Sequence, residues 1–201
     1  MTRKAVIIVV ALILVVGVVI GDSSGDKSLS PVEAFCAPTL YKDKCVSTIS
    51  PVAANASAGP KDFLRAALVA TMEEEKIWIE KAVAMKNDSF VPADNKALDD
   101  CKQFLEMGVR DLQSALAMVD DNELQGVYDE VDEFRNWLSG NLAFQDMCQE
   151  QIDNPDLKTR LQDGLRNATQ LTTNALVLFA ELSTILRSLN IPLEVNPKLT
   201  R

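Results

Sequence analysis

The chain has 201 residues, a formal net charge of −9 and a sequence pI of about 4.6. Its length suits one compact domain, and no basic run exceeds two residues, so an electropositive protein is a better expected partner than nucleic acid or an anionic membrane. Histidine is absent, which excludes a Ser-His-Asp or Cys-His nucleophile and leaves mainly carboxylate-based chemistry for an enzyme.

Residues 1–21 are expected to form a secretory signal peptide or an uncleaved signal anchor. Arg3 and Lys4 precede a continuous apolar run from Ala5 to Gly21, which is at the lower limit of length for spanning a bilayer. Cleavage stays open, and in both cases the rest of the chain is expected to enter the secretory lumen. Residues 22–30, rich in Gly, Ser and Asp, predict a flexible linker.

Four cysteines in a secreted chain predict two disulfides rather than free thiols. Cys36 and Cys45 are nine positions apart and could close a short helical hairpin, which leaves Cys101 to pair with Cys148. No metal or cofactor is expected, because the chain has no CxxC spacing and no histidine to support zinc.

Three Asn-x-Ser/Thr sequons are candidate N-glycosylation sites in a secreted protein. Asn55 and Asn87 lie in expected loops, whereas Asn167 lies within an expected helix and would have to face outward.

Downstream of residue 59 the apolar residues recur at helical spacing. The first long helix is expected to open at Pro60 and to run to about Met85, with the segment TMEEEK on its solvated side. The second is expected to have Asp94 as its N-cap and to end near residues 120–122. A third helix is expected over 124–148, and a fourth from the N-cap Asn154 to about Pro192.

These elements predict an all-α fold: an antiparallel up-down four-helix bundle (60–190) preceded by a disulfide-linked N-terminal helical hairpin (31–50). Together they form a helical domain over 31–192, with a tail over 193–201. Cys101 near the start of the second helix and Cys148 near the end of the third would meet in such a bundle. That bridge closes a loop of about fifty residues, worth on the order of 4 kcal/mol.

Several segments in order resemble the plant invertase/pectin methylesterase inhibitor family. They are the C-x8-C hairpin with Thr39, Tyr41, Asp43 and Lys44, ALDDCKQFLEMGVRDLQSAL (97–116), WLSGNLAFQDMC (137–148) and LTTNALVLFAELSTIL (171–186). The resemblance covers residues 32–189. The apolar leader and the Gln-Asp before Met147-Cys148 look closest to the inhibitor-like pro-regions of pollen-type pectin methylesterases.

The resemblance implies a domain that docks on a cell-wall enzyme, with 1:1 stoichiometry, and occludes its substrate cleft. It implies secretion to the apoplast or cell wall, with membrane anchoring if the leader is kept. Nothing in the 201 residues resembles the catalytic motifs of a pectin methylesterase, so no hydrolase activity is expected. Invertase inhibitors of this family carry a Pro-Lys-Phe loop element that is absent here, which favours pectin methylesterase as the target.

The family usually has Ser-Ala-Ala-Leu where this chain has Ser139-Gly140-Asn141-Leu142, and Thr-Cys where it has Met147-Cys148. Glycine and asparagine weaken a helix, so this departure bears on the potency of inhibition.

Candidate partner-binding residues are polar side chains expected on the outward faces of the second and third helices, although a plain solvated surface would have the same composition. They are Gln103, Glu106, Arg110 and Gln113 on one face, and Glu130, Glu133, Asn141 and Gln145 on the other. If interface carboxyls of raised pKa face acidic groups of the enzyme, binding is expected to weaken as pH rises toward neutrality.

Four other functions remain open at this point: a pro-region serving folding and retention of a downstream catalytic domain, an invertase inhibitor, a carrier of apolar ligands, and an enzyme. The Leu, Ala and Val stripes predict a packed core rather than a ligand cavity. Adjacent acids such as Asp99-Asp100 and Asp120-Asp121 point in different directions on a helix and suit general acid–base catalysis poorly.

Overall fold

The computed structural model of the protein describes residues 29–88 and 91–194. The expected leader, nearly all of the expected linker and most of the tail lie outside these ranges. Within them, no helix is both long enough and apolar enough to cross a membrane.

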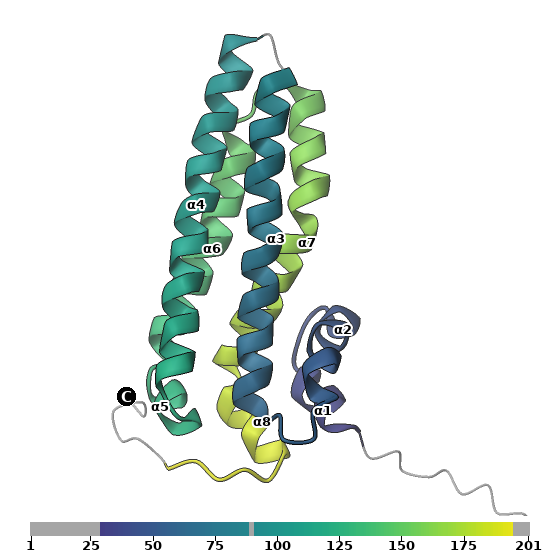
Figure 1. The fold of residues 1–201 in the computed structure, drawn as a ribbon, viewed down its shortest axis with the longest axis vertical. Helices are drawn as coiled ribbons and strands as arrows, with labels where there is room; N and C mark the ends of the chain where they lie inside the picture. The colour runs from purple at the N-terminus through teal and green to yellow at the C-terminus, as the bar shows by residue number, and fades with distance from the viewer. Residues whose placement is uncertain (1–28, 89–90, 195–201) are drawn as a thin grey trace, which may run out of the picture.

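Four long helices form the body of the molecule: α3 (Pro60–Asp88), α4 (Pro92–Asp121), α6 (Val131–Glu150) and α7 (Pro155–Ala180). Successive helices run in opposite directions (Figure 1). Helix α3 packs against α4 and α7, and α6 packs against the same two, so α3 and α6 face each other across the diagonal of the bundle. The residues described contain no strand, and the predicted all-α bundle is confirmed.

The third and fourth predicted helices are each interrupted once. Helix α5 (Leu124–Asp129) is separated from α6 by Glu130, and α8 (Leu182–Ser188) is separated from α7 by Glu181. Both glutamates leave helical geometry, with ψ of 20° and 14°, while backbone bonds such as Ile185 N to Glu181 O (2.9 Å) continue across the break. Apolar spacing reports which residues are buried, and it does not detect a one-residue change in the helix axis.

The N-terminal hairpin consists of α1 (Pro31–Cys36) and α2 (Lys42–Ala53), joined by the predicted disulfide between Cys36 and Cys45. It lies beside α3 and α7 at the lower end of the bundle in Figure 1. Helix α2 continues one turn past the expected end at residue 50, since Ala54 N still donates to Ser50 O. The hairpin shares a core with the bundle: the Phe35 ring meets Phe63 of α3 edge-on at 5.2 Å.

Three of the four starts predicted for the long helices agree with the structure, including the third at Leu124, where α5 begins. Helix α3 begins at Pro60, and the Asn154 side chain caps α7 by accepting bonds from the N–H groups of the first turn. The expected N-cap role of Asp94 is wrong, because α4 already begins at Pro92 and places Asp94 in its first turn. The Asp94 carboxylate instead accepts a bond of 2.9 Å from Asn154 Nδ2, which ties the start of α4 to the start of α7.

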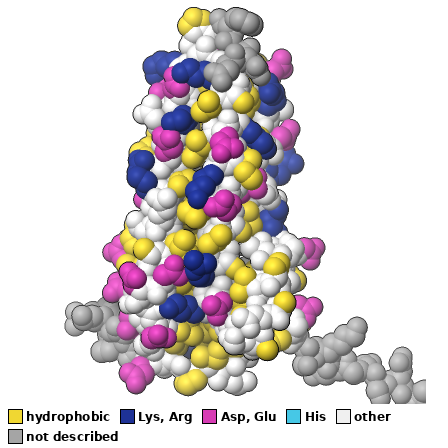
Figure 2. Space-filling model, in the orientation of Figure 1, with side chains coloured by type: hydrophobic (Ala, Val, Ile, Leu, Met, Phe, Trp, Pro, Cys, Tyr) yellow, Lys and Arg dark blue, Asp and Glu magenta, His cyan; other side chains and the backbone are white. Residues whose placement is uncertain are grey.

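The core contains two apolar clusters, one toward each end of the bundle. The cluster at the hairpin end includes the stacked rings of Phe134 and Phe179, 4.2 Å apart. The other includes Trp78 and the second predicted disulfide, between Cys101 of α4 and Cys148 of α6, both fully buried. On the outer surface shown in Figure 2, charged side chains of both signs are interspersed, and acidic ones are the more numerous toward the α5 end.

Candidate functional site

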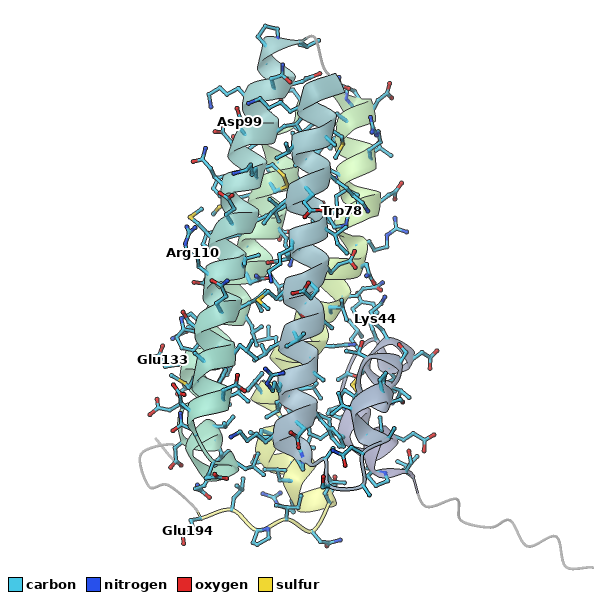
Figure 3. All side chains as sticks on the ribbon, viewed as in Figure 1. Lys44, Trp78, Asp99, Arg110, Glu133 and Glu194 are labelled. Atoms are coloured by element: carbon cyan, nitrogen blue, oxygen red, sulfur yellow. A yellow bond between two sulfur atoms is a disulfide. The ribbon has the colours of Figure 1, made fainter. Side chains whose placement is uncertain are left out.

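The residues predicted for α4 form one solvent-facing row. Gln103, Arg110 and Gln113 are exposed, and Glu106 is partly exposed and forms a salt bridge with Lys102. In Figure 3, Arg110 points outward from the side of the bundle formed by α4 and α6, away from the hairpin. This side therefore presents hydrogen-bonding groups that a protein partner could reach.

The residues predicted for the next face divide into two pairs. Glu130 and Glu133 are exposed at the junction of α5 and α6, and Figure 3 shows Glu133 on the same side of the molecule as Arg110. Asn141 and Gln145 are fully buried, so their expected outward orientation is wrong. The described structure brings six of the eight candidates to the surface and places two in the core.

The reason lies in the spacing along α6. Five residues at intervals of four and three point into the bundle: Phe134, Leu138, Asn141, Gln145 and Cys148. Leu142 is only half-buried because it lies off this row. The two amides occupy core positions of a heptad-like pattern, a signal already present in the sequence.

The two amides meet a carboxyl that was expected to be solvated. Glu75 of α3, in the segment TMEEEK, is fully buried, so that expectation is wrong for this residue. Glu75 lies between Thr71 and Trp78 on the inward face of α3, at a position where helical spacing would place an apolar residue.

A closed hydrogen-bond network surrounds Glu75. Asn141 Nδ2 donates to Glu75 Oε2 at 3.0 Å, and Gln145 Nε2 donates to Glu75 Oε1 at 2.7 Å. From α7, the Thr172 hydroxyl lies 2.8 Å from Gln145 Nε2, and the Thr169 hydroxyl donates to Gln145 Oε1 at 2.8 Å. We call these five residues the polar layer; it separates the two apolar clusters and joins α3 to α6 across the bundle diagonal.

A glycine on α4, Gly108, leaves room for the side chains of the polar layer. A β-carbon at Gly108 would lie 2.6 Å from Asn141 Nδ2 and 3.0 Å from Glu75 Oε2, closer than real β-carbon contacts allow. Glycine at this position therefore lets the α4 backbone approach the carboxyl and amide groups directly.

The electrostatics of the layer follow from burial. Desolvation is the largest effect and raises the pKa of Glu75 from 4.5 to about 7, while the hydrogen bonds from Gln145 and Asn141 lower it and the charge of Asp111 raises it. Burial also raises the pKa of Asp111, and the neighbouring Arg110 lowers it. The carboxyl of Glu75 is fully covered, so it lacks the contact with a substrate that general acid–base chemistry requires.

No metal site emerges from the described part of the chain, and the interior beneath the hairpin is closely packed. The described residues contain no group of three His, Cys, Asp or Glu side chains placed to hold a metal ion. The gap beneath the hairpin, lined by residues such as Ile49 and Leu178, has a volume of about 10 Å³, so the interior there is packed.

The hairpin is fixed to α7 by paired polar contacts. The Asn174 side chain accepts a bond from Tyr41 N (3.0 Å) and donates one to Tyr41 O (2.8 Å). Close by, Lys44 Nζ donates to Asn167 Oδ1. Asn167, one of the sequon asparagines, thus forms part of the contact between hairpin and bundle.

Two of the three sequon asparagines lie in different surroundings. Asn55 is exposed between α2 and α3, where its Oδ1 accepts bonds from the backbone and hydroxyl of Ser57. When the protein is expressed through a secretory pathway, we expect a glycan at Asn55 and none at Asn167, because the half-buried Asn167 side chain packs against Lys44 of the hairpin and has less room for a glycan. The side chain of Asn87 lies outside the described set.

Mass analysis of the secreted protein checks this expectation. Asn55→Gln should remove one glycan, whereas Asn167→Gln should leave the glycan mass unchanged. Glycopeptides that contain Asn167, or an unmodified Asn55, would contradict it.

Together these features define a class: disulfide-bonded helical-bundle domains with a closed polar layer in the core. The structure is similar to a solved pectin methylesterase inhibitor from Arabidopsis (a mutant form), with a TM-score of 0.58, 16% identity and coverage of 83% of this chain and 100% of that chain. At this identity the similarity establishes the fold.

Sequence comparison places the chain in a family. It is 28% identical to Pectinesterase 4 of Arabidopsis thaliana over 94% of this chain, and 28% identical to a pectinesterase/pectinesterase inhibitor of Brassica campestris over 90%. The chain spans about a third of the length of these relatives, 34% in both cases. Residues 30–178 match the family described as plant invertase/pectin methylesterase inhibitor, and the chain belongs to that family.

Proposed function

We propose that the helical domain of this chain inhibits a plant pectin methylesterase by binding it non-covalently and covering its substrate cleft. The observation that carries the proposal is the family match over residues 30–178, supported by the fold shared with a pectin methylesterase inhibitor. The domain itself is not an enzyme in this proposal. Its site of action is the cell wall or the secretory pathway, and it binds its target one to one.

The proposed contact surface consists of the six outward residues, Gln103, Glu106, Arg110, Gln113, Glu130 and Glu133. Arg110 and Glu133 of this set lie on the side of the bundle away from the hairpin in Figure 3, so a partner could dock there without contacting α1 or α2. Polar groups on a rigid helical face can fix the orientation of a partner at modest entropic cost. Asn141 and Gln145 contribute indirectly, by holding α6 in place.

The test is a titration of purified protein covering residues 22–201 against a plant pectin methylesterase and an acid invertase in parallel, at about pH 5.5. Loss of methylesterase activity alone supports the proposal, whereas loss of invertase activity alone would assign the chain to the other branch of the family. The titration repeated toward neutral pH checks the expected weakening of binding. Binding that stays unchanged between about pH 5 and 7.5 would contradict that expectation.

A charge reversal tests the surface. Arg110→Glu should raise the concentration for half-inhibition by at least roughly tenfold, because the partner group that accepts hydrogen bonds from the guanidinium would face a carboxylate. Arg187→Glu is the matched control: Arg187 is also exposed but lies on α8, away from the proposed surface. Equal inhibition by both variants would remove the α4 row from the interface.

A second candidate function is supported by the length of the relatives. Because the chain spans a third of proteins named pectinesterase, it corresponds to the inhibitor-like part of such proteins and could assist folding or retention of a catalytic domain. Co-expression of this domain with the catalytic part of a relative separates the functions. An increased yield of secreted active enzyme, without inhibition in the titration, would support the pro-region function.

A further inference from the structure

The centre of the bundle contains a carboxyl group without a cationic partner. Glu75 is fully buried, and no salt bridge to it is found in the described residues. Its two oxygens face the amides of Asn141 and Gln145 on the diagonally opposite helix. An anion held only by neutral amides in a dry interior is costly, so the protonation state of this group affects the whole bundle.

The polar layer can satisfy Glu75 in both protonation states. When the carboxyl is ionised, both amides donate to it, and Thr169 donates its hydroxyl proton to Gln145 Oε1 at 2.8 Å. When the carboxyl is protonated, the Gln145 amide can turn over, so that its oxygen accepts the carboxyl proton and its nitrogen donates to Thr169. The turn gives up the bond of 2.8 Å from Gln145 Nε2 to Asn141 Oδ1, so the two amide oxygens must move apart.

Alternative hydroxyl partners make this exchange possible. Thr169 Oγ1 lies 3.1 Å from Leu165 O and can donate there once Gln145 has turned. Thr172 Oγ1 likewise lies within reach of both Asn141 Oδ1 (3.1 Å) and Ala168 O (2.9 Å). Both hydroxyl groups therefore keep a hydrogen-bond partner in the two states.

The charges facing Glu75 come from one helix. On α4, the carboxylate of Asp111 repels Glu75, with Arg110 beside it. From α6 and α7 the facing groups are the neutral amides and hydroxyls of the polar layer. On α3 itself, the neighbouring Glu74 accepts a bond from Trp78 Nε1 instead.

We propose that the polar layer is a proton-operated latch: with Glu75 protonated it locks α3 to α6 and α7, and loss of the proton at neutral pH loosens these contacts. The latch is a property of the domain alone and requires no partner.

The raised pKa of Glu75, about 7 against 4.5 for an ordinary glutamate, places the transition between acidic and neutral pH. The folded state binds the proton more tightly than the unfolded state. Its stabilising effect is therefore complete below the unfolded value of 4.5 and is lost as pH rises through about 7. These values correspond to a rise of roughly 70-fold in the unfolding equilibrium constant between about pH 5 and pH 8.

The experiment measures the unfolding equilibrium by denaturant titration across this pH range. Glu75→Gln keeps the shape of the side chain but removes its proton site, and it should abolish most of the pH-dependent rise. Glu80→Gln is the matched control, since it makes the same charge change at an exposed position on the same helix and should keep the wild-type pH dependence. Equal pH dependence in the two variants would overturn the proposal.

A second measurement uses the wild-type protein alone and does not depend on whether a variant folds. The ¹³C shift of the Glu75 carboxyl in the wild-type protein should titrate with a midpoint near pH 7. Amide hydrogen exchange in α6 should accelerate over the same range. A midpoint below about pH 5, or an amide exchange rate in α6 that does not change as Glu75 titrates, would contradict the proposed latch.

Discussion

Replacing Cys101 and Cys148 together by alanine is expected to lower the free energy of unfolding by about 4 kcal/mol. The disulfide joins α4 to α6 across a sequence separation of 47 residues, so its removal restores a large amount of conformational freedom to the unfolded chain. Both cysteines are fully buried in the cluster farther from the hairpin, where no other covalent link among the described residues crosses the bundle. Denaturant unfolding under oxidising conditions measures the loss.

The hairpin disulfide supplies the comparison. Cys36 and Cys45 are separated by nine residues, and their joint replacement by alanine should cost about 3 kcal/mol in the same chain-entropy treatment. The bundle disulfide should therefore matter more for global stability. A smaller loss for the Cys101/Cys148 pair than for the hairpin pair would contradict this order.

Gly164→Ala is expected to destabilise the domain by about 3 kcal/mol. A β-carbon at position 164 would lie 1.6 Å from Trp78 Cη2 and 1.9 Å from Cζ2, so the indole ring could not keep its place against α7. Trp78 is only 8% exposed in the structure and would lose most of its packing. The measurement is denaturant unfolding combined with tryptophan fluorescence, whose emission should shift to longer wavelength as the ring enters water.

Gly140→Ala is the matched control because it makes the same change inside another long helix. A β-carbon there would meet Asp111 Oδ2 at 3.5 Å, an ordinary contact, so the gain in helix propensity should dominate. We expect it to stabilise the domain by roughly 0.5–1 kcal/mol. If Gly164→Ala were also stabilising, the close packing of Trp78 on α7 would be wrong.

The elements predicted correctly share one physical origin. The leucine rows of α4 and α7 bury one continuous stripe each, and because the described residues contain no strand, each stripe is buried against other helices. Local chemistry alone defines the start of α7. The Asn154 side chain accepts hydrogen bonds from N–H groups of the first turn, and the proline after it has no N–H with which to continue a helix toward the N-terminus. The disulfide pairing followed from the short spacing of Cys36 and Cys45, and the bundle topology is compatible with the remaining pair.

The candidate site was predicted less completely, and the polar layer shows why. A polar residue type predicts an outward orientation, yet Asn141, Gln145 and Glu75 occupy inward positions of their helices. Spacing alone could have placed each of them inward. It could not show that the three meet, because Glu75 is 66 residues from Asn141 and their contact crosses the diagonal of the bundle.

The sequence by itself thus determined the helices, their order, the two disulfides and the family, because each depends on local spacing or on a short motif. Only the tertiary structure decided which polar groups reach solvent and which satisfy each other inside. A buried polar side chain is tolerated where partners from other helices complete its hydrogen bonds, and those partners are assembled by the packing of the whole bundle.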